Sequence, residues 1–159
     1  MVKGDLIATR DAYGKALAQY GAEYPELVVL DADLTGSTKT SLFAAKYPER
    51  FIEMGIAEQD MLGTAAGLAA AGKIPFASTF AIFATGRAWD QARNAIAYPQ
   101  FNVKIAATHA GLTVGEDGAT HQALEDIALM RVIPGMTVVV PADAVETEQA
   151  VKALIEHVG

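Results

Sequence analysis

Short apolar runs alternate with segments of helical periodicity along nearly the whole chain, and this alternation restricts the possible folds more than any other feature. The apolar runs lie at residues 27–31, 51–54, 74–79, 102–108 and 137–140. Such runs between helices of about ten to fifteen residues are typical of right-handed βαβ units, whose parallel sheets carry helices on both faces. We therefore predict an α/β fold with a parallel sheet of about five or six strands, in a single domain over residues 1–159.

The intervening helices are predicted from apolar spacing and from residues that begin or end helices. Thr9 is a candidate N-cap of the first helix, and Gly21 is a candidate end. Pro48 stops a short second helix, and Gly72 follows an alanine-rich third one. The predicted helices span about residues 9–20, 42–47, 58–71, 88–98, 124–131 and 144–157.

Composition excludes several classes of partner. The chain carries a net charge of −7 with 52% hydrophobic residues and no cysteine. The acidic balance argues against nucleic acid and anionic membranes, and the lack of cysteine excludes disulfides and a thiolate nucleophile. No apolar run approaches the roughly 18 to 20 residues that span a bilayer, and residues 1–10 lack a signal-peptide core. We expect a cytoplasmic protein.

Polar residues gather where the predicted strands end, and open parallel sheets bind ligands at that edge. The loops concerned are 33–37, 55–58, the segment after 79, and 109–121. The last loop contains His109, Asp117 and His121, but no spacing typical of a metal site is present, so we predict no metal ligands. Phosphate-binding glycine motifs are also absent, so a phosphate would need side chains such as Arg10. A solvated glycine loop and hydrogen bonding to a hydroxylated substrate both remain open for 109–121.

Glu58 lies at the turn between the second strand and the alanine-rich helix. A first-turn glutamate ordinarily stabilises a helix N-terminus. The neighbours Met54, Ile56 and Met61 are apolar, which favours a carboxyl that keeps a proton near neutral pH, as a functional acid would. The residues themselves leave both interpretations open. The small side chains of the helix also indicate that a neighbouring helix or subunit approaches its backbone.

Six motifs together resemble the pyrimidine-binding domain of transketolase, which has a thiamine-diphosphate-binding fold of the pyrimidine type. The resemblance covers nearly the whole chain in the family's order and spacing. The motifs are IATR at 7–10, DADLTGST at 31–38, GIAEQDM at 55–61, FASTFAIF at 76–83, THAGLTVGEDGATHQALEDIALMRVIPGM at 108–136 and VVPAD at 139–143. The GEDGATHQ block together with GIAEQ is specific to thiamine-diphosphate enzymes of the transketolase group.

The resemblance implies roles in cofactor binding for five residues. Glu58 is expected to hydrogen-bond the N1′ nitrogen of the cofactor's aminopyrimidine and so favour the tautomer that activates the cofactor. Phe80 and Phe83 are expected to pack against this ring, with Asp33 and Leu34 near it.

The resemblance also implies a substrate site. Arg10, Ser37 and His109 are expected to hold the phosphate of a sugar phosphate. Asp117 and His121 are expected to bind sugar hydroxyls and assist proton transfer, so that they join Glu58 and His109 as catalytic residues. The related deoxyxylulose-phosphate synthases usually carry arginine at the position of His109, which favours transketolase.

Departures from the family pattern predict partners. Many members place a tyrosine for pyrimidine stacking where this chain has Gly86, so a neighbour such as Arg87 could take that contact. The GDG motif of the diphosphate and Mg²⁺ site is absent, as are the diphosphate-binding and carboxy-terminal domains. We therefore expect the carboxy-terminal subunit of a split transketolase, inactive alone. Its expected partner is an amino-terminal subunit that carries GDG and binds Mg²⁺.

We expect this assembly to be a homo-dimer or hetero-tetramer that acts on sugar phosphates. One alternative is a related thiamine-diphosphate enzyme, such as a deoxyxylulose-phosphate synthase or the beta subunit of a 2-oxoacid dehydrogenase. The other is a non-catalytic assembly module of the same fold. Retention of Glu58, Asp117 and His121 argues against the module.

Overall fold

Four parallel strands form the centre of the molecule in the computed structural model, which describes residues 6–159. The strands stand in the order β2-β1-β3-β4. β1 pairs on both sides, with Val29 opposite Phe51 on one side and Phe76 on the other. The strands are β1 (Leu27–Asp31), β2 (Phe51–Glu53), β3 (Ile74–Phe80) and β4 (Lys104–Thr108).

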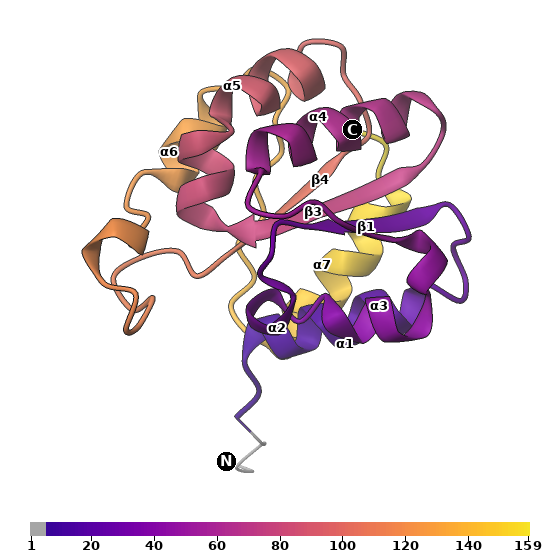
Figure 1. The fold of residues 1–159 in the computed structure, drawn as a ribbon, viewed down its shortest axis with the longest axis horizontal. Coiled ribbons are helices and arrows are strands. Elements are labelled where there is room, and N and C mark those ends of the chain that lie inside the picture. Colours follow the sequence, from indigo (N-terminus) through magenta and orange to yellow (C-terminus); the bar gives the residue numbers. More distant parts are fainter. Residues whose placement is uncertain (1–5) are drawn as a thin grey trace.

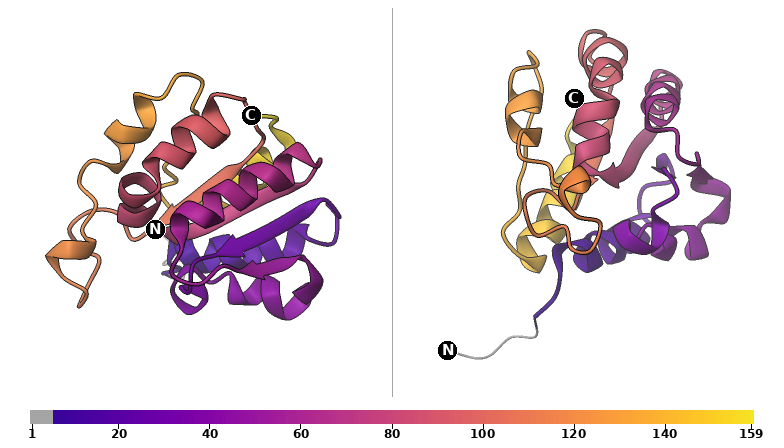
Figure 2. Two further views of the ribbon diagram at one scale, coloured as in Figure 1. Left: turned by 45° about the horizontal axis from the view of Figure 1, so that its top comes forward. Right: turned by 60° about the vertical axis from the view of Figure 1, so that its left-hand side comes forward.

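Helices cover both faces of this sheet (Figure 1). One face carries α4 (Glu58–Ala70) and α5 (Trp89–Gln91), and the other carries α1 (Thr9–Tyr20), α3 (Ser41–Lys46) and α7 (Ala144–Glu156). Figure 2 shows the same layers from two further directions. Shorter elements are α2 (Thr35–Thr38), α6 (Asp126–Arg131), the 3-10 turns Pro48–Arg50 and Ala119–His121, and the π-helical turns Phe83–Arg87 and Ala92–Ala97.

The core is divided into two layers by the alternation of side chains along β1. Val28 and Leu30 pack into the cluster beneath α4 and α5, whereas Leu27 and Val29 pack into the cluster beneath α1, α3 and α7. All five residues of β1 are buried, because a central parallel strand has no solvent-facing side. The predicted α/β fold with a doubly covered parallel sheet is confirmed.

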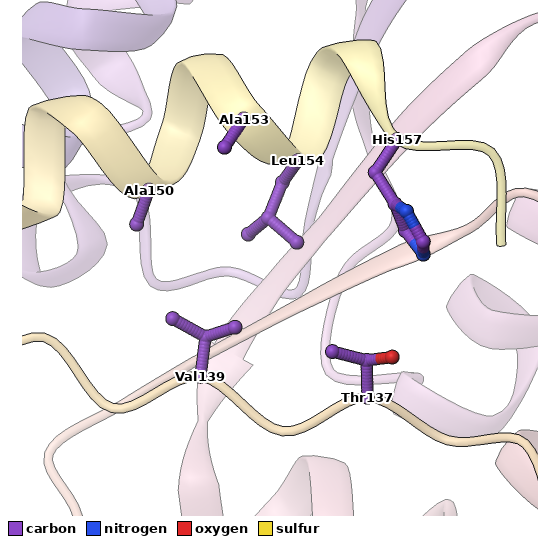
Figure 3. Close-up of a pocket in the computed structure, with 6 residues that line it drawn as sticks. All are labelled: Thr137, Val139, Ala150, Ala153, Leu154 and His157. Atoms are coloured by element: carbon purple, nitrogen blue, oxygen red, sulfur yellow. The ribbon is translucent and has the colours of Figure 1, made fainter.

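The predicted strand at 137–140 is wrong. The segment pairs with no strand among the described residues, and Val139 and Val140 are 47% and 65% exposed. Thr137 and Val139 instead face α7 across a shallow pocket of about 310 Å³ (Figure 3), which is also lined by Ala150, Ala153, Leu154 and His157. A β-branched run becomes a strand only where a neighbour supplies a ladder in register, and local sequence does not encode this. Residues 6–159 therefore hold four strands, fewer than the five or six expected.

Two helix boundaries also differ from the predictions. Thr9 is the first residue of α1 rather than its cap, because Ala8 takes the N-cap position and its side chain makes no capping hydrogen bond. The helix predicted to begin at residue 88 is preceded by the π-helical turn Phe83–Arg87, in which the Ala88 N–H donates to the Phe83 carbonyl at 3.1 Å. Such turns insert one residue into a helix and are frequent at functional sites. Among the described residues, no helix is both long and apolar enough to cross a membrane.

Candidate active site

The carboxyl ends of the strands bring four chain segments together at one edge of the sheet. Glu58 begins α4, Phe80 ends β3, His109 follows β4, and Arg10 is the second residue of α1. In Figure 1 the arrowhead of β3, the start of α4 and the loop 109–121 all lie on the left side of the molecule. This edge is where a parallel α/β sheet binds its ligands.

Glu58 is buried and paired with an arginine. Its side chain is 2% exposed, and Arg87 Nη1 donates to Glu58 Oε2 at 2.7 Å. The apolar surrounding expected for Glu58 is only partly present: Met61 is fully buried, but Ile56 is 76% exposed. The prediction that Ile56 shields the carboxyl is therefore wrong, because the turn before α4 directs this side chain to solvent. The carboxylate is stabilised by a charge-assisted hydrogen bond that sequence analysis did not anticipate.

The two predicted aromatic residues form a stack beside this ion pair. Phe80 and Phe83 lie with ring centroids 6.1 Å apart and planes 8° from parallel. The Arg87 guanidinium carbon lies 4.5 Å from the centre of the Phe83 ring, on the aromatic face that attracts cations. His121 meets Phe83 edge-on at 5.2 Å, and His109 packs on Phe80 at 4.2 Å. Phe80 and Phe83 thus contact both candidate histidines, and Arg87 connects Phe83 to the Glu58 carboxylate.

Arg10 and His109 form a polar pair on the far side of Phe80. Arg10 Nη1 lies 3.2 Å from His109 Nε2 and 3.5 Å from the Ser37 carbonyl oxygen. Because a guanidinium only donates, Nε2 must be the acceptor, which places the His109 proton on Nδ1, where it can donate to Thr108 Oγ1 at 2.9 Å. Burial lowers the pKa of His109, and the charge of Arg10 adds to this effect, while Asp117 opposes it. The arrangement favours a neutral His109 and presents a cationic Arg10.

Two acids hold the loop after β1 in place. Asp31 is fully buried: its Oδ1 accepts from the Leu34 N–H at 2.7 Å, and its Oδ2 accepts from the Thr38 and Thr40 hydroxyls at 2.6 and 2.8 Å. Burial raises the pKa of Asp31, while these hydrogen bonds act in the opposite direction. The loop can therefore hold Asp33 at a φ of +61°, in the left-handed region.

Glu53 ties this loop to the turn before α4. Its Oε1 accepts from the backbone N–H groups of Asp33 at 2.8 Å and Gly55 at 3.1 Å. Asp31 and Glu53 are thus positioning residues for the edge of the site. Sequence analysis missed this role, although the hydroxyl-rich stretch after Asp31 is a usable signal for a buried acid that needs donors.

The structure brings some predicted residues together and leaves others apart. Arg10, Ser37, Glu58, Phe80, Phe83, His109 and His121 belong to one connected set of contacts. The side chains of Asp33 and Asp117 are exposed, and Leu34 contributes through its backbone N–H. Within residues 6–159 no three His, Asp or Glu side chains are placed to hold a metal ion.

Fold and site together define the class of protein: a parallel α/β domain with a buried acid, stacked aromatic rings and an arginine–histidine pair at the carboxyl edge of its sheet. Residues 5–159 match the family described as the transketolase pyrimidine binding domain. The chain belongs to this family, and transketolases use thiamine diphosphate.

Three similar proteins illustrate the relationship. The putative transketolase C-terminal section of Methanocaldococcus jannaschii is 57% identical over 150 residues, which cover 94% of this chain and 48% of the relative. A solved structure described as a split gene transketolase, inactive beta4 tetramer, is 62% identical with a TM-score of 0.87, covering 98% of this chain and 50% of that one. Transketolase from Pichia stipitis in complex with sedoheptulose-7-phosphate is 32% identical with a TM-score of 0.86, covering 98% and 25%.

This chain thus spans about half the length of the first two relatives and a quarter of the third. The names of these relatives support transketolase, rather than a deoxyxylulose-phosphate synthase or a 2-oxoacid dehydrogenase.

Proposed function

We propose that this chain is the pyrimidine-binding part of a transketolase that moves a two-carbon ketol unit from a ketose phosphate to an aldose phosphate. The observation that carries the proposal is the buried carboxylate of Glu58 beside the stacked rings of Phe80 and Phe83. A planar aminopyrimidine has ring nitrogens that hydrogen-bond to an acid and flat faces that pack on aromatic rings. Glu58 offers the acid, and Phe80 and Phe83 offer the rings. These residues therefore fit thiamine diphosphate.

Within this site Glu58 would hold the N1′ nitrogen of the aminopyrimidine through a shared proton, and Phe80 and Phe83 would pack against the ring, with Asp33 and Leu34 at its border. When bound, thiamine diphosphate supplies the electron sink that two-carbon transfer requires. The burial of Glu58 excludes water from its carboxyl, which strengthens any hydrogen bond that it makes.

The substrate is held on the other side of Phe80. Arg10 binds the phosphate of the sugar, with His109 and Ser37 beside it. A guanidinium suits this role because it is positively charged and donates several hydrogen bonds to phosphate oxygens. Burial lowers the pKa of His109 and so favours the neutral ring, whose Nε2 accepts from Arg10 and orients the guanidinium. Asp117 and His121, from the loop after β4, bind sugar hydroxyls and move protons at the reacting carbon.

A partner subunit completes the enzyme. We assign the cofactor diphosphate, its Mg²⁺ and the GDG motif to an amino-terminal subunit, and we expect a dimer or hetero-tetramer. Two features support an amino-terminal partner subunit. One is that relatives are named as a C-terminal section and as a split gene transketolase. The other is that side chains leave part of the α4 backbone uncovered. Gly63 and Gly67 are exposed, and a Cβ atom at either would meet nothing within 4 Å among the residues that the structure describes. This face of α4 accommodates close packing by another subunit, and the isolated chain is inactive.

The test is two-carbon transfer by the complete subunit with its amino-terminal partner, thiamine diphosphate and Mg²⁺. Glu58→Gln removes the shared proton but preserves side-chain shape, and we expect it to lower kcat by about 100-fold or more. Glu146→Gln is the matched control, because Glu146 also lies in the first turn of a helix, α7, and accepts the Ala142 N–H at 2.6 Å. If both variants keep near-normal rates, Glu58 is only a helix-terminal charge and the proposal fails.

A further inference from the structure

The ion pair at the start of α4 leads beyond the proposed function, on which the following inference rests. We propose that Arg87 competes with the aminopyrimidine for its binding place, so that the release of this side chain sets the affinity for thiamine diphosphate. Arg87 makes both contacts that the proposed function assigns to the cofactor ring. It donates to Glu58 Oε2 at 2.7 Å, and its guanidinium carbon lies 4.5 Å from the centre of the Phe83 ring.

The chemistry of the guanidinium makes this competition direct. A guanidinium is a planar group with N–H donors at its edge and a face that stacks on aromatic rings. An aminopyrimidine that hydrogen-bonds to Glu58 and packs on Phe83 needs the same carboxyl group and the same aromatic ring. Both groups cannot occupy that place together.

The surroundings allow Arg87 to leave. Its side chain is 47% exposed, while that of Glu58 is 2% exposed. The carbonyl of Arg87 accepts from Gln59 Nε2 at 3.2 Å, which anchors the backbone and leaves the side chain free to rotate. A rotation about side-chain bonds therefore carries the guanidinium into solvent without disturbing the helix.

Local sequence explains why an arginine reaches this place. Arg87 ends the π-helical turn Phe83–Arg87, and this turn sets its guanidinium over the Phe83 ring. Gly86 precedes it, and a Cβ atom there would meet only Ile82 Cδ1, at 4.0 Å. The position expected to carry a stacking tyrosine thus has no side chain, and the next residue fills the aromatic face.

The experiment measures thiamine diphosphate affinity by isothermal titration calorimetry, with saturating Mg²⁺ and the complete subunit assembled with its amino-terminal partner. Arg87→Met retains the length of the side chain but removes the charge and the planar donor group. We expect Arg87→Met to bind thiamine diphosphate about tenfold more tightly, because the ring no longer displaces an ion pair and a cation–π contact. Arg87→Lys keeps the charge without the planar face and should fall between the two.

The matched control is Arg93→Met, which removes another arginine stacked on an aromatic ring, 5.8 Å from the centre of Trp89. Arg93 has no contact with Glu58, so its variant should bind thiamine diphosphate as the unmodified chain does. If Arg87→Met binds thiamine diphosphate equally or more weakly than the unmodified chain, the inference is overturned but the proposed function is not. Arg87 would then either have no effect on binding of the aminopyrimidine or contribute to it. Failure of the unmodified assembly to bind thiamine diphosphate would instead remove the proposed function, and this inference with it.

Discussion

Replacement of Asp31 tests the network that shapes the loop after β1. In Asp31→Ala the Leu34 N–H loses its acceptor, whereas the hydroxyls of Thr38 and Thr40 can bond to each other, since they lie 3.1 Å apart. One buried unpaired donor costs about 1–3 kcal/mol, and the cavity left by the carboxyl adds roughly 1 kcal/mol. We therefore expect Asp31→Ala to lower the free energy of unfolding by about 2–4 kcal/mol.

Asp31→Asn separates the shape of this side chain from its charge. The amide oxygen can still accept the Leu34 N–H, and the Thr38 and Thr40 hydroxyls can rotate to accept from the amide, so the expected cost is about 1 kcal/mol at pH 7. Burial raises the pKa of Asp31 above its ordinary 3.8. The folded chain therefore binds more protons there than the unfolded chain, and the stability from Asp31 is lost as pH rises through its folded pKa. The cost of Asp31→Asn should shrink over the same pH interval.

The assay is urea unfolding of the chain and both variants, followed by circular dichroism at several pH values. Comparison of each variant with the unmodified chain removes the contributions of all other carboxyl groups. Equal costs for alanine and asparagine, or a cost of asparagine that grows as pH rises above 3.8, would refute this account of the network.

Three further predictions concern His109, Gly14 and Gly63. Because the pKa of His109 is lowered in the folded chain, stability should fall as pH decreases below 6.5, and His109→Gln should weaken that fall while His157→Gln, at an exposed histidine, should not. Gly14→Ala should destabilise the chain by about 1–3 kcal/mol, because its Cβ would lie 2.4 Å from the Lys39 carbonyl oxygen. In urea unfolding Gly63→Ala should instead stabilise the isolated chain by about 0.5–1 kcal/mol, since its Cβ meets no atom of residues 6–159 within 4 Å. In sedimentation with the partner, the same change should weaken assembly.

Strands that are buried on both faces were predictable from sequence, because residues 27–30 are apolar without interruption and the structure buries all of them together with Asp31. The run at 137–140 has similar composition but lies beside α7, and no strand within residues 6–159 pairs with it. Composition reports a tendency to form strands, while pairing depends on neighbours that are distant in sequence. For this reason the number of strands was overestimated.

Within the site, sequence motifs identified the segments but not their contacts. The position of Glu58 at the start of α4 was predicted from sequence. Its ion pair with Arg87 was not, because Arg87 lies 29 residues away in the sequence. That contact depends on the π-helical turn, which periodicity analysis does not detect. Ile56 was predicted to shield the acid because it is apolar, but a side chain's direction in a turn is set by backbone geometry rather than by hydropathy.

The most direct test of the account is a crystal structure of the complete subunit assembled with its amino-terminal partner, thiamine diphosphate and Mg²⁺. The account predicts that the Glu58 carboxyl lies within hydrogen-bonding distance of the pyrimidine N1′ nitrogen, with Phe83 against the ring and the Arg87 guanidinium displaced from it. A pyrimidine bound away from Glu58, or a Glu58 side chain turned into solvent, would contradict it.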